Sequence, residues 1–531
     1  MKLMTLHFAL AFVLSQMMYA QYPNVRLNSP TSTTPEEVSI AINPVNPLNL
    51  VAGANIRYAY RSTDGGLSWI ESQMTSTYGV WGDPCLTFDA LGNAYYGHLS
   101  NSPSPGYWID RIVVQKSTNG GVSWNSGAGI GYNPPRKEQD KEWLAADMTN
   151  STYRNNLYVS WTDFDDYGSS LLTDSSRIFF SRSTDGGINW STAVRVSDKA
   201  GDCIDSDNTD EGAVPAIGPN GEVYLSWSGP LGIMFDKSTD GGVTFGTDRF
   251  VTTQPGGWDF NISGIQRCNG LPITAADVSN SRYRGNIYIN WSDQRNGLTN
   301  TDIFLVKSTD GGQTWSSARK VNDDLTTTQQ FFTWMTIDQT TGFLYFVFYD
   351  RRNTTTTATD VYVARSTDGG ETFNNFKVSQ SSFSPQAGTF FGDYTGIAAF
   401  NRKIYPIWMR LDGSILSVWT ALINDTTGTN DITESLEKPA EFQLLQNYPN
   451  PFNPTTTIEF HVGKPNNVLL EVFDVMGRKV ATLADEYQHA GWHSVRWDAT
   501  NTDAIAKSTG VYFYQLRSGS YVERKKLLLL K

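Results

Sequence analysis

The chain has 531 residues, a formal net charge of −12 and 18% charged side chains. This acidic balance argues against a nucleic-acid partner, and the length indicates more than one domain. Aromatic residues at 13% and a total of 46 glycines are typical of a turn-rich all-β protein, which is the fold class that we expect.

The amino terminus has the pattern of a secretory signal peptide over residues 1–20. Lys2 precedes an apolar run from Leu3 to Leu14, and cleavage after Ala20 would leave Gln21 as the first residue. The apolar run is too short to span a bilayer, and no other stretch is long enough. We therefore expect a secreted protein without a transmembrane segment after removal of the signal.

One phrase, Ser-Thr-Asp/Asn-Gly-Gly-x-x-Trp/Phe, occurs six times at intervals of 55 to 70 residues. The copies are Ser62–Trp69, Ser117–Trp124, Ser183–Trp190, Ser238–Phe245, Ser308–Trp315 and Ser366–Phe373. A long constant period indicates one supersecondary unit that is copied many times. Asp followed by two glycines suits a tight hairpin turn, so we interpret the phrase as structural.

A second phrase with alternating apolar residues, such as Asn156–Trp161 and Gly285–Trp291, marks a strand in each unit and occurs seven times. The last unit has no copy of the first phrase and no outer strand. Asn24–Asn28 resembles the missing strand, so we predict that it pairs with the last unit and closes a ring.

The first phrase resembles the Asp box, or BNR repeat, of the sialidase-like β-propellers. The resemblance implies a β-propeller over residues 21–423. Seven repeat units predict seven blades; six blades are the alternative, because sialidases have six.

Residues 424–441 are polar and without periodicity, so we expect a linker. Residues 442–531 contain the segments Asn447–Ile458, Phe473–Arg478 and Gly510–Tyr514. This part closely resembles the type A C-terminal sorting domain of type IX secretion cargo. The resemblance implies a small Ig-like β-sandwich, the type IX secretion machinery as a partner, and a location that is extracellular or attached to the outer-membrane surface.

Three cysteines are present in a chain that we expect to be exported, and export permits disulfides. Cys203 and Cys268 lie in long insertions of neighbouring repeats and are a candidate pair. Cys85 is then expected to be a small buried residue.

Only five histidines are present, which argues against zinc sites built from several histidines. Chemistry would have to rest on carboxylates, Tyr and Arg in the loops that lead into the innermost strands, at one mouth of the channel. We expect the mouth residues to be Asp83, Glu142, Glu211, Arg267, Asp393 and Tyr394. Aromatic residues that could stack on sugar rings there are Trp81, Trp143, Phe331 and Phe332.

The expected function is binding of a glycan or another extracellular ligand at this mouth. The alternative is an exo-sialidase-like glycoside hydrolase, for which the resemblance implies Tyr394 as nucleophile, Glu211 as its helper and Asp83 as acid. The family's arginine clamp is incomplete here, since no Arg lies between Arg365 and Tyr394. A protein-interaction scaffold or adhesin is a third hypothesis.

One acidic loop is a candidate Ca²⁺ site, because oxygen-rich spacing of this type suits that ion. Its carboxylates are Asp202, Asp205, Asp207 and Asp210, with Asn208 and Glu211 beside them. A solvated acidic loop is the alternative, and no other cofactor is expected.

Overall fold

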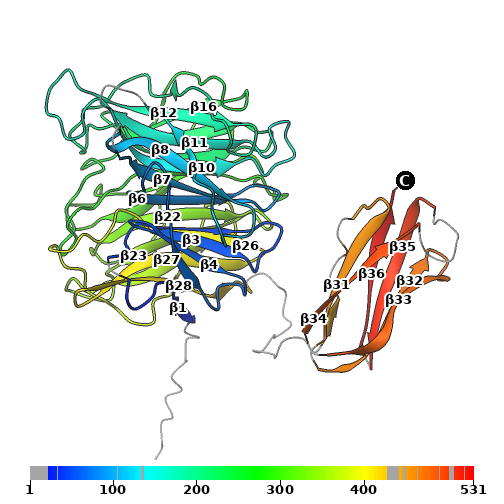
Figure 1. Cartoon of the computed structure of the whole chain (residues 1–531). Coiled ribbons are helices and arrows are strands. Elements are labelled where there is room, and N and C mark those ends of the chain that lie inside the picture. Colours follow the sequence, from blue (N-terminus) through cyan, green and yellow to red (C-terminus); the bar gives the residue numbers. More distant parts are fainter. Residues whose placement is uncertain are drawn as a thin grey trace, which may run out of the picture. The chain divides into compact units, whose positions relative to one another are not determined.

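The computed structural model describes residues 22–426 apart from 33, 104–105 and 133–136, and residues 442–530 apart from 445–446, 448–449, 463, 490, 501–507 and 520. The chain divides into two compact units, Met1–Thr426 and Thr427–Lys531. Every regular element of the described residues is a strand (Figure 1). These residues include no helix that could cross a membrane.

The described part of the first unit forms seven antiparallel sheets. The first contains β2 (Val38–Ile42), β3 (Leu50–Ala54), β4 (Tyr58–Ser62) and β5 (Ile70–Gln73). The second contains β6 (Gly82–Phe88), β7 (Ala94–Asn101), β8 (Trp108–Ser117) and β9 (Ala128–Ile130). The third contains β10 (Glu138–Ala146), β11 (Leu157–Phe164), β12 (Ser176–Ser183) and β13 (Val194–Arg195).

The remaining sheets repeat this order. The fourth contains β14 (Glu211–Ile217), β15 (Val223–Gly229), β16 (Gly232–Ser238) and β17 (Arg249–Thr252). The fifth contains β18 (Ile273–Ala276), β19 (Ile287–Asp293), β20 (Asp302–Ser308) and β21 (Arg319–Lys320). The sixth contains β22 (Gln330–Asp338), β23 (Phe343–Asp350), β24 (Asp360–Ser366) and β25 (Asn374–Lys377). The seventh contains β26 (Gly396–Phe400), β27 (Lys403–Asp412), β28 (Ile415–Ala421) and β1 (Asn24–Arg26), with β29 (Ile423–Asn424) beside β27.

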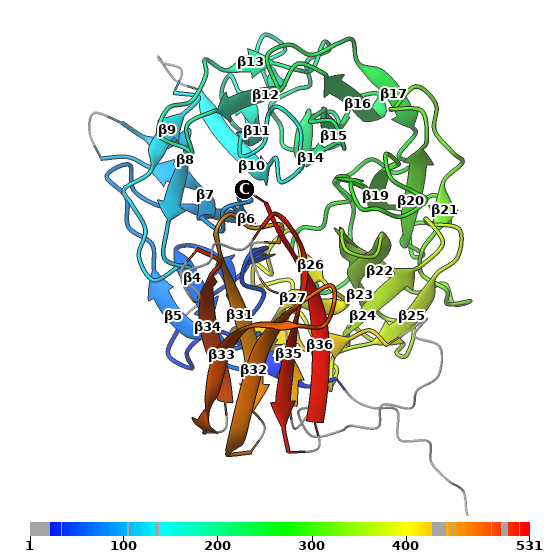
Figure 2. The ribbon, with the colours of Figure 1, turned by 90° about the vertical axis from the view of Figure 1, so that its right-hand side faces the viewer.

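The first strand of each sheet, or inner strand, contacts the inner strand of the next sheet in the order β2, β6, β10, β14, β18, β22 and β26. β26 in turn contacts β2, which closes the ring. In Figure 2 the inner strands β10 and β14 lie toward the centre, and the outer strands β13 and β17 lie at the rim. The first unit is therefore a β-propeller.

The amino-terminal strand β1 completes the last sheet. It pairs with β28, with Asn24 opposite Ala421 and Arg26 opposite Trp419, and the amide of Leu27 donates to the carbonyl of Val418 at 2.9 Å. This confirms the predicted ring closure. The pairing also covers an edge of β28 that would otherwise present unpaired backbone groups.

The six Asp boxes lie at the turns that follow the third strand of the first six sheets. In the copy Ser183–Trp190, Ser183 donates to Asp185 at 2.8 Å, and the amide of Asn189 donates to the same carboxylate at 2.9 Å. These bonds, led by the one from Asn189, lower the pKa of Asp185 to about 2. The charged carboxylate therefore stabilises the turn of the box by accepting hydrogen bonds from residues of the same turn.

The two glycines of a box allow it to lie flat against the preceding sheet. A Cβ on Gly241 would lie 2.5 Å from the Tyr153 ring, and one on Gly242 would lie 2.6 Å from Phe180. Both glycines also have positive φ, 72° and 80°. Glycine is thus needed twice over, for the backbone conformation and for the close approach.

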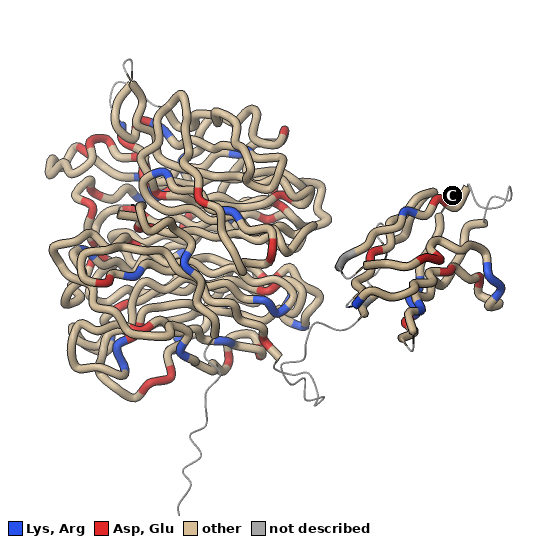
Figure 3. The backbone as a smooth tube through the Cα atoms, turned by 60° about the horizontal axis from the view of Figure 1, so that its bottom comes forward, with Lys and Arg blue, Asp and Glu red and all other residues tan. Residues whose placement is uncertain are grey.

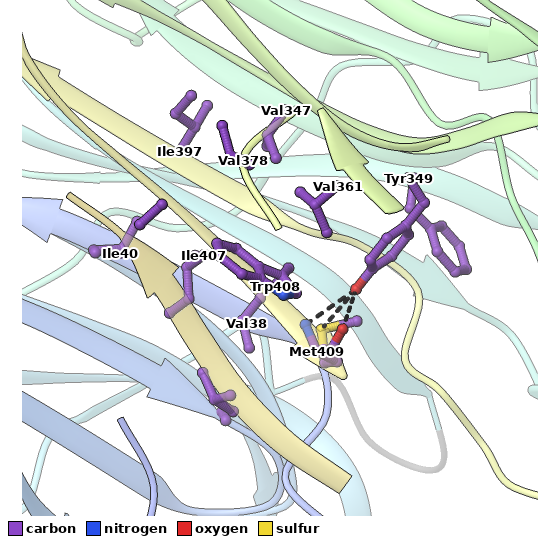
Figure 4. Close-up of a cluster of buried hydrophobic side chains, with 14 of the residues drawn as sticks. Val38, Ile40, Val347, Tyr349, Val361, Val378, Ile397, Ile407, Trp408 and Met409 are labelled. Carbon is purple, nitrogen blue, oxygen red and sulfur yellow. Dashed lines mark hydrogen bonds between the residues drawn. The ribbon is translucent and has the colours of Figure 1, made fainter. Parts of the chain in front are cut away.

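Adjacent sheets are joined by buried side chains. Figure 4 shows one such cluster, in which Tyr349 of β23 donates to the carbonyl of Met409 in β27 at 2.9 Å. The amide of Met409 returns a bond to the same hydroxyl at 3.0 Å. Val38, Val361 and Ile407, all fully buried, belong to this cluster. The Tyr side chain thus buries its ring without leaving its polar end unpaired.

The second unit contains two sheets around its own core. One has the order β30 (Phe442–Leu444), β31 (Thr455–Val462) and β34 (Gly491–Asp498). The other has the order β33 (Lys479–Gln488), β32 (Asn466–Asp474), β35 (Gly510–Ser518) and β36 (Tyr521–Leu529). Alternate residues of β31, among them Ile458 and Phe460, are buried against Leu470 and Tyr514 of the facing sheet. The alternation is the period of two that a half-buried strand requires.

The cysteines correct one expectation. Cys85, Cys203 and Cys268 are all buried free thiols, so the suspected bridge between Cys203 and Cys268 is wrong. Cys268 lies with Phe260, Phe331 and Tyr349 in one hydrophobic cluster. It is there a small apolar side chain, a common environment for an unreactive cysteine.

Candidate functional site

The inner strands begin at one end of the ring, which we call the mouth, with a shared backbone distortion. A β-bulge follows the first residues of four of them, at Gly82/Cys85, Asp140/Trp143, Glu211/Val214 and Phe331/Trp334. Non-glycine residues with positive φ lie at or next to this position: Glu37, Asp83, Lys141 and Phe332. A bulge re-aims side chains, and such strained residues concentrate at functional sites.

Lys141 lies at the centre of a cluster of acidic side chains at the mouth. Its Nζ is 2.8 Å from Asp393 Oδ2, 3.1 Å from Asp83 Oδ2 and 3.8 Å from Glu37 Oε1. The lysine side chain is only 6% exposed. Burial lowers the pKa of Lys141, but Asp393 and Asp83 outweigh this effect and hold the pKa well above its usual value.

Arg267 forms the second cationic part of this network. Its Nε donates to Asp393 Oδ1 at 3.0 Å, and its Nη2 donates to the other oxygen of the same carboxylate. Its Nη1 donates to Asp205 Oδ2 at 3.0 Å. Burial raises the pKa of Asp393. The charges of Lys141 and then Arg267 outweigh this effect and hold the pKa below its usual value, so this carboxylate is ionised. The bidentate pair fixes the arginine at the mouth.

Burial raises the pKa of further carboxyl groups of the mouth, among them Glu142, Glu211 and Asp140. Burial, reinforced by Asp83, raises the pKa of Glu142 well above its usual value. Neither carboxylate oxygen of Glu142 has a hydrogen bond to another described residue. Burial and then the charge of Asp205 raise the pKa of Glu211 in the same direction, and burial raises the pKa of Asp140 to about 7. The mouth therefore combines ionised and neutral acids.

An aromatic cluster, which we call the plug, lies beside these charges. The ring of Trp143 lies 4.3 Å from that of Trp334 and 5.0 Å from that of Tyr394. Beside the plug is a cavity of about 20 Å³, lined in part by Lys141 and Asp393, which is room for about one water molecule. Trp143 is 8% exposed, and Phe331 and Phe332 are buried. These three rings therefore belong to the core beneath the mouth.

The residues that the sialidase resemblance assigns to catalysis are not joined by hydrogen bonds to one another. Tyr394 is 7% exposed, and its hydroxyl has no hydrogen bond to Glu211, to Asp83 or to any other described residue. The activated tyrosine of such a mechanism needs an adjacent base. A general acid needs a proton near neutral pH. Burial raises the pKa of Asp83, but Lys141 and then Glu37 bring it below its usual value.

The exposed part of the mouth carries aromatic rings. Trp81 is 39% exposed and Trp108 is 40% exposed, and their centroids lie 6.1 Å apart at 88°. Trp108 meets Tyr167 at 5.7 Å, and the hydroxyl of Tyr167 donates to Asp205 at 2.7 Å. These contacts connect the tryptophan pair to Asp205 and, through it, to Arg267.

Sequence reasoning missed Lys141, Trp108 and Tyr167. Lys141 is the lysine of the Lys-Glu-Trp loop and could have been singled out as a cation among acids. Trp108 is the first residue of the third strand β8, and Tyr167 lies in the connection after β11. Neither position has a repeated sequence pattern, so no sequence signal placed them at the mouth.

The four aspartates of the candidate Ca²⁺ loop point to different partners. Asp202 accepts from Thr209 at 2.9 Å, and Asp207 accepts from the amide of Asp259 at 2.9 Å. Asp205 is bound to Arg267, and burial raises the pKa of Asp210 to about 8. In the described residues, no group of three or more Asp, Glu, His or Cys side chains could hold a metal ion.

Comparisons with known proteins concern the two units separately. Residues 446–530 match the model of the secretion system C-terminal sorting domain. No curated protein matches the chain.

Several solved structures resemble the fold. YCF48 bound to a D1 peptide has 12% identity and a TM-score of 0.40, covering 77% of this chain and 98% of that one. The α-L-arabinofuranosidase Arb93a from Fusarium graminearum, in complex with an iminosugar inhibitor, has 13% identity and a TM-score of 0.42, covering 76% and 98%. The NanB sialidase from Streptococcus pneumoniae has 9% identity and a TM-score of 0.42, covering 71% and 83%.

At these identities and TM-scores, the similarity to solved structures supports no inference about activity. The family match is different, because it identifies a domain by its sequence. Residues 446–530 are a type IX secretion C-terminal sorting domain, and the chain that carries it is a secreted protein.

Proposed function

We propose that the protein is a seven-bladed propeller, one blade for each sheet, that binds a glycan at its mouth outside the cell. In this proposal, type IX export through an Ig-like sorting domain delivers it to the medium or to the outer-membrane surface. Residues 1–20 serve as signal peptide and 424–441 as linker.

The observation that carries the proposal is the exposed pair Trp81 and Trp108 beside Tyr167 and Arg267. Large amphipathic rings offer apolar faces to the C–H faces of a sugar. Arg267, with 35% of its side chain exposed, is a hydrogen-bond donor for sugar hydroxyls or acidic groups. The buried Lys141 network beneath holds this arginine in place, which keeps the cost of ordering low on binding.

The test uses the mature secreted protein on a glycan array, followed by calorimetry with the glycans that bind. Trp81→Ala and Trp108→Ala are each expected to weaken binding about tenfold, as loss of a ring-stacking contact does. Phe250→Ala is the matched control, since Phe250 is 54% exposed in the outer strand β17. Absence of glycan binding, or full binding by both tryptophan variants, would reject the proposal.

A glycoside hydrolase is the second candidate, and the neutral Glu211 beside the carboxylate of Asp205 is the observation that favours it. Glycoside hydrolysis uses a pair of carboxyl groups, one of which keeps its proton near neutral pH and acts as general acid. Turnover of chromogenic glycosides that is lost in Glu211→Gln and in Tyr394→Phe would support this candidate with the tyrosine as nucleophile. Capture of a protein, without a glycan, would instead favour the scaffold or adhesin.

A further inference from the structure

The end of the ring opposite the mouth is hollow. All seven inner strands finish there around a cavity of about 640 Å³, which we call the funnel. Ligand pockets for small molecules have volumes of roughly 300–1,000 Å³. The proposed function uses only the mouth, so the funnel has no role in it.

Small side chains give the funnel its width. Six inner strands contribute three consecutive residues each to the wall, for example Leu144–Ala146 of β10 and Thr274–Ala276 of β18, and β26 contributes the four residues Ile397–Phe400. The second residues of these segments are Ala41, Thr87, Ala145, Ala216, Ala275, Thr336 and Ala398. A ring of alanine and threonine leaves open a space that larger residues would fill.

The aromatic plug lies next to the inner end of the funnel. The plug of Trp143, Trp334 and Tyr394 lies between it and the mouth, and Trp143 and Trp334 come one residue before the wall residues Leu144 and Met335.

The wall is depleted of acidic groups. Acidic and basic residues are spread over the turns of the first unit (Figure 3), and the chain has a net charge of −12. None of the described residues that line the funnel is Asp or Glu, and Arg284 is the one charged residue among them. Asn150, Asn280 and Gln339 add amides at the same end.

Arg284 belongs to a loop that has a matched counterpart in another sheet. Its Nη1 donates to the carbonyl of Ser279 at 3.0 Å and to that of Val278. Arg154 makes the equivalent bonds to Thr149 at 2.6 Å and Met148 at 2.9 Å. Arg154 is not among the described lining residues of the funnel. The two arginines thus share a structural role, and Arg284 alone adds a positive charge to the funnel.

We propose that the funnel is a second binding site, for an apolar small molecule that carries one anionic group. The apolar part lies against Ile40, Leu86 and Ile397, and Arg284 pairs with the anion at the rim. An apolar cavity with a few polar groups at defined positions is the usual composition of a small-molecule site. A cationic ligand would meet Arg284 and no compensating carboxylate.

The test measures the fluorescence of two probes with the mature full-length protein: 8-anilinonaphthalene-1-sulfonate, which is anionic, and N-phenyl-1-naphthylamine, its neutral analogue. Both are expected to bind with one molecule per chain. Arg284→Gln is expected to weaken the sulfonate about tenfold, the effect of losing one charge-assisted hydrogen bond, and to leave the neutral probe unchanged. Arg154→Gln is the matched control and should affect neither probe.

A second variant fills the site without touching the charge. Ala275→Phe is expected to abolish binding of both probes, while Trp81→Ala at the mouth leaves both unchanged. Equal effects of Arg284→Gln and Arg154→Gln, or sulfonate binding that persists in Ala275→Phe, would overturn the proposal. Binding of the neutral probe alone would reject the anionic group.

Discussion

Lys141 Nζ and Asp393 Oδ2 lie 2.8 Å apart and join two sheets that are not neighbours in the ring. Lys141 is in the inner strand β10, and Asp393 comes just before the inner strand β26. The pair therefore holds the ring together across its centre, in addition to the contacts between adjacent sheets. Because Asp393 also binds Arg267, one buried carboxylate links the interior network to the exposed mouth.

Removal of the Lys141 charge should lower the free energy of unfolding. Lys141→Met leaves Asp83 and Asp393 buried without their shared cation, and breaking a buried ion pair from one side costs about 3–5 kcal/mol. Arg319→Met is the control, since Arg319 pairs with Glu371 with 52% of its side chain exposed, and such a pair contributes up to about 1 kcal/mol. Urea unfolding measures both. Equal decreases in the free energy of unfolding for the two variants would contradict a larger contribution of the Lys141 network.

The stability of the fold should fall as pH rises, in part because of Glu36. Burial, and then the charge of Asp83, raises its folded pKa to about 8 from a usual value of 4.5. Between these two values the unfolded state loses the proton and the folded state keeps it, so the free energy of unfolding decreases with pH. The effect is about 1.4 kcal/mol for each pKa unit that separates the states.

The variant Glu36→Gln should remove this part of the slope. Urea midpoints at about pH 5, 6.5 and 8 are the measurement, and the gain over the wild type should grow with pH over this range. Glu371→Gln serves as control, because a hydrogen bond from Lys307 lowers the pKa of Glu371. That group titrates below the range, and its variant should keep the wild-type slope. A constant difference between Glu36→Gln and wild type would contradict the prediction.

The Asp-box glycines should tolerate no side chain. Gly241→Ala combines a φ of +72° with a Cβ 2.5 Å from the Tyr153 ring, and strain with overpacking typically costs about 1–3 kcal/mol. Gly413 has a φ of +65° and no atom within 4 Å, so Gly413→Ala measures the backbone term alone. Gly388 has neither constraint. In thermal unfolding, the decrease in midpoint should be largest for Gly241→Ala, smaller for Gly413→Ala and smallest for Gly388→Ala. An unchanged midpoint for Gly241→Ala would contradict this prediction.

The ring closure by β1 can be tested by truncation. A chain that begins after Asn28 lacks β1 and exposes the edge of β28, and an exposed edge strand favours association with other chains. We expect a lower thermal midpoint and soluble aggregates in size-exclusion chromatography. A chain that begins at Tyr22 keeps the strand and is the control. A monomeric truncated chain with an unchanged midpoint would show that β1 is dispensable.

The three cysteines should be free in the exported protein. Because all are buried, iodoacetamide should leave the folded protein unmodified and should alkylate every thiol after unfolding without reductant. Mass spectrometry of the intact chain counts the added groups. A disulfide-linked peptide that contains Cys203 and Cys268 would contradict the structure.

Local patterns accounted for the architecture. The turn chemistry of Ser62–Trp69 and its five copies, with the alternation in segments such as Asn156–Trp161, predicted an all-β propeller. The seventh unit, which lacks an outer strand, predicted the partner of Asn24–Asn28, and the antiparallel pairing of β1 with β28 confirmed it. The sorting domain was also recognisable from its segments, and the family match confirms it. These features can be identified in the sequence because they involve residues close together in the chain and recur in several copies.

The composition of the site was decided by the tertiary structure. Most mouth residues, including Asp83 and Arg267, were predicted, but their roles depend on contacts across the ring that follow no sequence period. Lys141 neutralises Asp83, Tyr394 lies in the plug rather than beside a base, and Cys203 and Cys268 remain unpaired. The sequence by itself determined the fold and the route of export, since both are written in local patterns. Only the folded ring decided which charges meet and where it is hollow, because distance and burial arise from packing among residues far apart in the chain.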